Sequence, residues 1–64
     1  MQELIYLKQQ LDLMIEVREI KILNGNISDM ETYRAVVGEL TGLRMAIREI
    51  DDLHKKQEEI DNAE

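Results

Sequence analysis

The sequence predicts an all-α protein: an antiparallel hairpin of two helices that association with other chains completes. Three observations support this. The chain has no proline, and it is rich in Leu, Ile, Met, Glu, Lys and Arg, which favour helix. Apolar residues recur at helical spacing before and after one short break. The break contains turn residues, so we expect one domain with a helix over about 2–23, a turn at 24–28 and a helix over about 29–60.

The first predicted helix carries one continuous apolar stripe. The residues of this stripe fall within roughly 100° of one another at helical spacing: Leu4, Leu7, Leu11, Met14, Ile15 and Ile22. Asn24-Gly25 is expected to end the helix, because glycine adopts the left-handed conformation that satisfies the last carbonyls. Lys21 in the final turn suits the negative end of the helix dipole.

The second predicted helix begins with the pattern of a capping box. Ser28 is the expected N-cap, and Glu31, at the third helical position, is expected to reach back to it. An apolar seam with alternating spacings of three and four residues follows: Tyr33, Val36, Leu40, Leu43, Ile47 and Ile50. The seam fades at His54 and Gln57, which occupy its next two places.

A short turn between two long amphipathic helices makes them antiparallel neighbours. The stripe and the seam are therefore the expected hairpin core. Counting back from the turn puts residue 51 level with Met1, so residues 52–64 are expected to form a charged C-terminal overhang. This overhang is a solvated extension or a docking arm, and the pattern favours the solvated extension.

Each helix has a second face that a hairpin cannot cover, and we interpret the two faces as a partner interface. Their residues are Tyr6, Leu13, Val17 and Ile20 on the first helix and Ala35, Gly38, Gly42 and Ala46 on the second. A glycine inside a helix costs about 1 kcal/mol relative to alanine, which favours a groove for close helix packing. Alternatively, the glycines are merely tolerated or admit a large side chain of the first helix. The opposite pairing of faces is also possible, and it predicts association equally.

Composition argues against several classes of protein. A chain of 64 residues is small enough to need a disulfide, a metal or a partner for firm stability. Cysteine is absent and there is one histidine, so we expect no disulfide, no zinc centre and no cofactor. A net charge of −6 disfavours nucleic acid. We expect protein partners, with no nucleic acid, membrane or small molecule.

No catalytic constellation is evident. His54 has Asp51, Asp52 and Glu58 within helical reach, but a solvated surface histidine is favoured over a metal site, because no third strong ligand is fixed nearby. The apolar runs are far shorter than the roughly 20 residues that span a bilayer. The start, Met1-Gln2-Glu3-Leu4, lacks the cationic residues of a signal peptide. The chain is therefore expected to be neither an enzyme, nor transmembrane, nor secreted.

The segment from Tyr33-Arg34 through Gly38-Glu39-Leu40-Thr41-Gly42-Leu43 to Asp51-Asp52-Leu53 carries a recognisable pattern. It resembles short helical-hairpin accessory proteins of tailed bacteriophages, which share a Tyr-Arg pair, a Gly-x-x-x-Gly-Leu core and an acidic Asp-Leu end. The resemblance covers roughly residues 24–53, and the first helix matches only as generic amphipathic sequence. It implies a phage-encoded accessory protein of the capsid, portal or tail connector.

The leading hypothesis for function is a non-enzymatic structural protein of a virion or of virion assembly, located in the virion or the host cytoplasm. It would oligomerise or dock on a larger phage assembly by helix packing. The alternative is a small acidic regulator, an inhibitor of a host protein or an antitoxin-like adaptor. A regulator that occupies a basic nucleic-acid-binding surface of a host protein needs carboxylates along one exposed face. Here much of the acidic excess lies in the C-terminal overhang, which favours the structural function.

Overall fold

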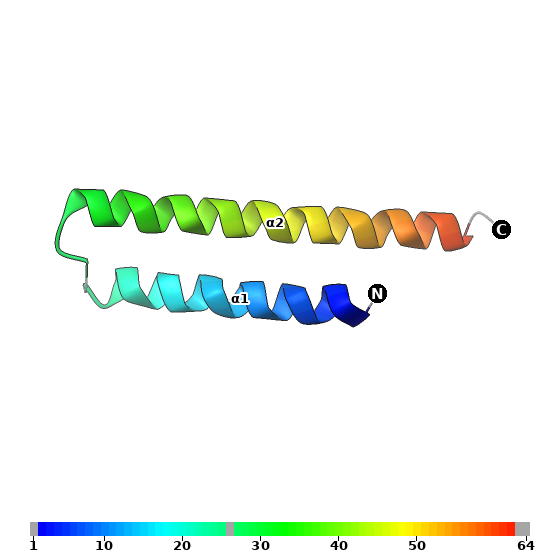
Figure 1. Cartoon of the computed structure of the whole chain (residues 1–64), viewed down its shortest axis with the longest axis horizontal. Helices are drawn as coiled ribbons and strands as arrows, with labels where there is room; N and C mark the ends of the chain where they lie inside the picture. Colours follow the sequence, from blue (N-terminus) through cyan, green and yellow to red (C-terminus); the bar gives the residue numbers. More distant parts are fainter. Residues whose placement is uncertain (1, 26, 63–64) are drawn as a thin grey trace.

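A computed structural model describes residues 2–25 and 27–62 and shows two helices that lie antiparallel (Figure 1). Helix α1 spans Gln2–Leu23 and helix α2 spans Met30–Asn62. The predicted all-α hairpin is confirmed, although α2 begins one residue later and runs slightly further than expected. Residues 63 and 64 of the predicted overhang lie outside the described residues.

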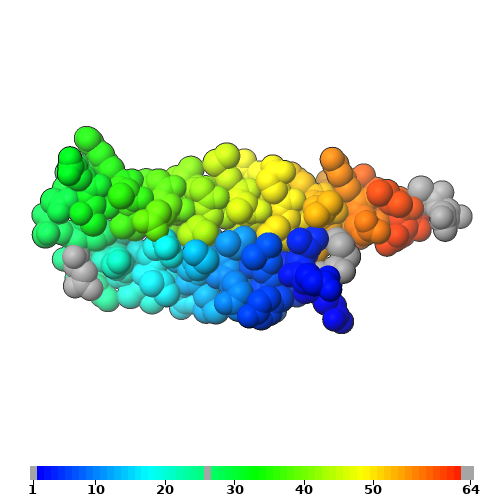
Figure 2. Space-filling view, in the orientation of Figure 1, coloured from blue at the N-terminus to red at the C-terminus, as the bar shows by residue number. Residues whose placement is uncertain are grey.

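The molecule is a rod that measures 55 × 16 × 14 Å. Its length is that of α2, because 33 residues at a rise of 1.5 Å each span about 50 Å. The two helices pack side by side, and the C-terminal part of α2 protrudes beyond the start of α1 (Figure 2). Within the described residues, neither helix combines the length and the apolar character that a bilayer-spanning helix needs.

The end of α1 follows the prediction. Gly25 has a left-handed φ of 67°, which glycine adopts without a steric penalty. Its backbone N–H donates to the carbonyl of Ile22 at 3.2 Å, and the N–H of Asn24 donates to Ile20 at 2.9 Å. These bonds satisfy carbonyls of the last turn that would otherwise lack a helical partner.

The cap of α2 is Asp29, and the prediction of Ser28 with Glu31 was wrong by one residue. A carboxylate oxygen of Asp29 accepts a hydrogen bond from the N–H of Thr32 at 2.7 Å, and the Asp29 carbonyl accepts from Tyr33 at 3.1 Å. Both residues suit an N-cap, but the carboxylate also carries the negative charge that the helix N-terminus favours. The hydrogen bond from Thr32 holds the pKa of the Asp29 carboxyl below its usual value.

The capping role of Asp29 is tested by two alanine variants. Asp29→Ala should lower the thermal midpoint of the hairpin, whereas Ser28→Ala should change stability by no more than about 0.5 kcal/mol. Because the folded-state pKa of Asp29 is depressed, its contribution is present at neutral pH and is lost as the pH falls through that pKa. Circular dichroism melts of both variants measure this. A larger loss for Ser28→Ala would restore the original assignment.

The hairpin core lies on the predicted seam of α2. Val36, Leu40 and Ile50 are buried, with exposed fractions of 5%, 5% and 7%. They are the only buried residues in the described part of the chain. Half-buried residues complete the predicted core: Leu4, Leu11, Ile15, Ile22, Leu43 and Ile47. Three predicted core residues, Leu7, Met14 and Tyr33, are instead exposed.

The exposure of Leu7 and Met14 follows from the face that α1 turns to α2. The half-buried positions of α1 are 4, 8, 11, 15, 18 and 22, which alternate spacings of four and three as a packed seam does. Lys8 and Arg18 therefore occupy seam positions that the sequence analysis missed. Helix α2 packs along one edge of the predicted stripe, and Leu7 and Met14 lie along its other edge.

The register of the two helices also differs from the one predicted by counting residues back from the turn. Asp51 pairs with Lys8 at 2.7 Å and therefore lies level with the second turn of α1, not with its start. The reason is visible at the turn, where the first turn of α2 extends past the end of α1 (Figure 1). Residues near 51–57 therefore lie beside α1, and the charged overhang begins later than residue 52.

Candidate functional site

One long side of the hairpin is polar and is closed by ion pairs between the helices. Lys8 pairs with Asp51 at 2.7 Å and Arg44 with Glu19 at 3.7 Å. The hydrogen bond from Lys8 to Asp51, together with the carboxylate's charge, raises the pKa of Lys8. These side chains are substantially exposed, so each pair contributes little stability. This polar side also bears apolar surface, because the exposed Leu23, Tyr33 and Val37 line a hollow there beside Glu19 and Arg44.

The opposite surface of α1, which we call the outer face, is apolar. It consists of Tyr6, Leu13, Val17 and Ile20, with exposed fractions of 64%, 54%, 60% and 46%. The positions lie on the side of α1 that points away from its seam at 100° per residue. The predicted first-helix part of the partner interface is therefore exposed in the single chain. Nothing in the hairpin covers it.

A second apolar surface lies along one edge of the contact between the helices. We call it the open side and define it by Leu7, Met14, Gly42, Ala46 and Leu53. Met14 and Gly42 line a hollow there together with Arg18, Glu39 and Leu43. Leu7 lies two helical turns before Met14, Ala46 one turn after Gly42, and Leu53 two turns after Ala46, so all continue the same side. The predicted second-helix face overlaps this surface.

The two mid-helix glycines have empty space beside them. A Cβ atom placed on Gly38 or Gly42 would meet no atom within 4 Å. The alternative that they admit a large side chain of the first helix is therefore wrong. Ala35, Gly38 and Gly42 are exposed, and Ala46 is half-buried. Their small size hollows the surface without serving the contact between α1 and α2.

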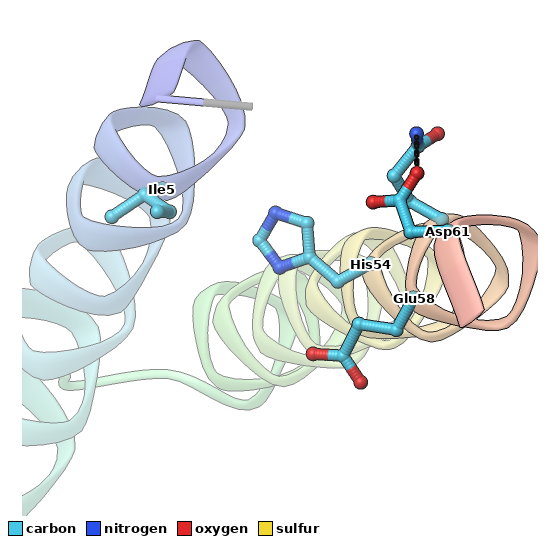
Figure 3. Close-up of a pocket in the computed structure, with 5 residues that line it drawn as sticks. Ile5, His54, Glu58 and Asp61 are labelled. Atoms are coloured by element: carbon cyan, nitrogen blue, oxygen red, sulfur yellow. Dashed lines mark hydrogen bonds between the residues drawn. The ribbon is translucent and has the colours of Figure 1, made fainter.

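His54 is not the solvated surface residue that the sequence indicated. Its ring points from α2 toward Ile5 of α1 (Figure 3), and the side chain is half-buried. The Nε2 atom is buried and has no hydrogen-bond partner among the described residues. Gln57, Glu58 and Asp61 line the same pocket, with a hydrogen bond of 3.4 Å from Gln57 to Asp61. His54 thus continues the seam of α2 with a polar atom at a position where an apolar side chain would pack.

Replacing His54 with leucine should stabilise the hairpin by about 1–2 kcal/mol, because the change removes a buried unpaired nitrogen and adds apolar packing against α1. Lys55→Leu is the matched control, since it adds the same side chain at the next, exposed position. The control should change stability by no more than about 0.5 kcal/mol. Urea titration of both variants measures the difference. Equal effects would show that His54 does not face α1.

The described residues hold no group of three or more His, Cys, Asp or Glu side chains that could bind a metal ion. The arrangement offers apolar surfaces and a hollow, which are features of protein docking. No protein-family model, no curated protein and no solved structure matches the chain. Its own residues therefore carry the functional argument.

Proposed function

We propose that this chain is a non-catalytic structural and interaction protein that works by packing its apolar surfaces against other protein chains. One observation carries the proposal: three residues are buried, whereas 14 large hydrophobic residues are exposed among those that the structure describes. Exposed apolar residues are common singly, but here seven of the 14 form two surfaces, the outer face and the open side. Contiguous apolar surface of this kind marks interaction sites.

The distribution around α1 supports the same proposal. A surface helix of a globular protein has one apolar stripe and an opposite polar face. On α1 most apolar residues occupy the seam, the open side and the outer face, and Ile5 and Leu23 lie among the polar residues near the ion pairs with α2. A helix that is apolar on most sides is normally buried by several neighbours. Helix α2 covers only one of those sides.

The setting that we propose is a phage virion or its assembly, as a minor component of the capsid, portal or tail connector. This setting rests on the Tyr-Arg, Gly-x-x-x-Gly-Leu and Asp-Leu pattern of residues 24–53 alone, since no family match supports it. A rod with an apolar outer face suits a part that is wedged between larger subunits. In that setting the chain is found in the virion or, before assembly, in the host cytoplasm.

The alternative function, an acidic regulator that mimics nucleic acid, has less support from the arrangement of charge. Three carboxylates lie in ion pairs between the helices: Glu19, Glu39 and Asp51. Paired carboxylates have their charge locally neutralised and do not form a row that resembles phosphates.

Sedimentation of lysates from phage-producing cells tests the proposed function. The tagged chain should sediment with assembled particles in a fixed ratio, and a Val17→Glu variant should remain with the small proteins, because a carboxylate on the outer face cannot be buried without a partner. Thr41→Glu, an exposed change on the polar side of α2, is the control and should behave as the parent chain. A parent chain that sediments as a free small protein would contradict the proposal.

A further inference from the structure

We infer that a second copy of this chain occupies the open side, so that two hairpins form a four-helix bundle. This inference deepens the proposed function, because it names the occupant of one of the two apolar surfaces. The outer face of α1 remains for a different partner. The exposed area of the hairpin, the shape of the open side and the charges along it favour a second copy as the occupant.

The hairpin exposes more surface than a compact protein of its mass, and the difference indicates how much area a partner could cover. The chain exposes 5281 Å², whereas a compact monomer of its 7.5 kDa exposes about 4,200 Å². Its radius of gyration is 15.6 Å, compared with roughly 11 Å for a compact chain of this length. The hairpin thus has an excess of about 1,000 Å² over a compact monomer.

A second hairpin supplies an area of the required size. Two copies packed as compactly as one protein of twice the mass would together bury up to about 3,500 Å². Obligate homodimers bury about 2,000–5,000 Å², so this estimate lies within their range. Even half of the estimated 3,500 Å² would equal a protein–protein interface of standard size, about 1,600 Å². A dimer therefore removes the excess surface without a larger partner.

The shape of the open side fits helices of similar size. On both helices, apolar residues of the open side lie next to the seam at intervals of about two helical turns. Examples are Leu7 and Met14 on α1 and Ala46 and Leu53 on α2. An apolar stripe that is too wide for one neighbouring helix to cover is typical of a helix in a bundle, which contacts two other helices. The hollow at Gly42 has room for a side chain from the second copy.

The charges along the open side favour the same chain as the occupant. Helix α1 presents Arg18, Lys21 and, five turns before Lys21, Glu3 on this side, and α2 presents Glu39 and Glu49, with Arg18 and Glu39 paired to each other. Rotation about the long axis of the hairpin lays α1 on α2 of the second copy. Lys21 then lies near the level of the copy's Glu39, which already pairs with Arg18 of its own hairpin. An interface about a two-fold axis must complement itself in this way. Although the net charge of the chain is −6, the open side carries charges of both signs and does not select a strongly basic partner.

Sedimentation equilibrium of the purified full-length chain tests the inference. The parent chain should have twice the monomer mass of 7.5 kDa at micromolar concentration. Gly42→Leu should raise the dissociation constant roughly 10-fold to 100-fold, because the leucine fills the hollow. The variant should still fold, since the space beside Gly42 is empty in the single hairpin. Thr41→Leu places the same side chain at the next residue, on the polar side, and should leave the dimer unchanged.

Two results would overturn the inference. A parent chain that remains a monomer up to millimolar concentration would exclude the second copy. A Gly42→Leu variant that dimerises as tightly as Thr41→Leu would exclude the open side as the interface, provided that circular dichroism shows both variants equally helical. Neither result touches the proposed function, which is tested by the outer-face variant Val17→Glu in phage-producing cells.

Discussion

Leu40→Ala is expected to unfold the chain at low micromolar concentration. Leu40 is 5% exposed and is one of the three buried residues in the described part of the chain. Truncating a buried leucine to alanine costs about 2–5 kcal/mol, and a core this small leaves little stability in reserve. Circular dichroism at 222 nm should show loss of most helical signal at 25 °C.

Leu13→Ala is the matched control for this experiment. It makes the same chemical change on the outer face, where Leu13 is 54% exposed. At low concentration the control should remain folded and lose less than about 1 kcal/mol, because an exposed side chain contributes little packing. If Leu13→Ala were as damaging as Leu40→Ala, the outer face would be packed in the monomer, and the division between core and outer face would be wrong.

Most of the fold could be predicted from the sequence because its signals are local. The Asn24-Gly25 pair specifies a helix end by its own backbone preference, and Gly25 has the expected left-handed φ of 67°. The absence of proline and the regular apolar spacing predict the two helices that are observed. The seam of α2 is also clear, because its apolar residues form one row with few competitors.

The face of α1 that meets α2 could not be predicted by the same means. Apolar residues lie on several sides of α1, so spacing alone does not select one. The observed seam includes Lys8 and Arg18, whose long aliphatic stems can line an apolar contact while their charges reach a carboxylate. Their partners, Asp51 and Glu39, are distant in sequence. The alternating spacing 4-8-11-15-18-22 was the available signal, and the two cations obscured it.

The predictions of the register and of the N-cap were wrong for different physical reasons. Ser28 and Asp29 are both good N-cap residues, and a difference of one residue decides between them. The register depends on how the turn leaves α1, which residue counting cannot show. As a result, His54 was assigned to the solvated overhang, although it lies beside Ile5 of α1.

The candidate surfaces were predicted in part. The outer face was recognised because four apolar residues lie opposite the predicted stripe, and all four are exposed. The open side was not recognised as such, since Leu7 and Met14 were assigned to the hairpin core. Their exposure follows because the observed seam is centred about 20° around α1 from the predicted stripe, which leaves Leu7 and Met14 at its edge. That difference places the small residues of α2 and the exposed edge of α1 on the same side.

The central claim, that association covers the apolar surface of this hairpin, is tested most directly by the dependence of the thermal midpoint on protein concentration. For a dimer that unfolds to two separate chains, a hundredfold increase in concentration adds about 2.7 kcal/mol of stability. With the unfolding entropy of two 64-residue chains, this corresponds to a rise of roughly 10 °C in the midpoint. Circular dichroism melts between about 5 and 500 μM, a range chosen to span that hundredfold change, should show this rise. A midpoint that stays constant over this range, with the mass of a monomer, would contradict self-association.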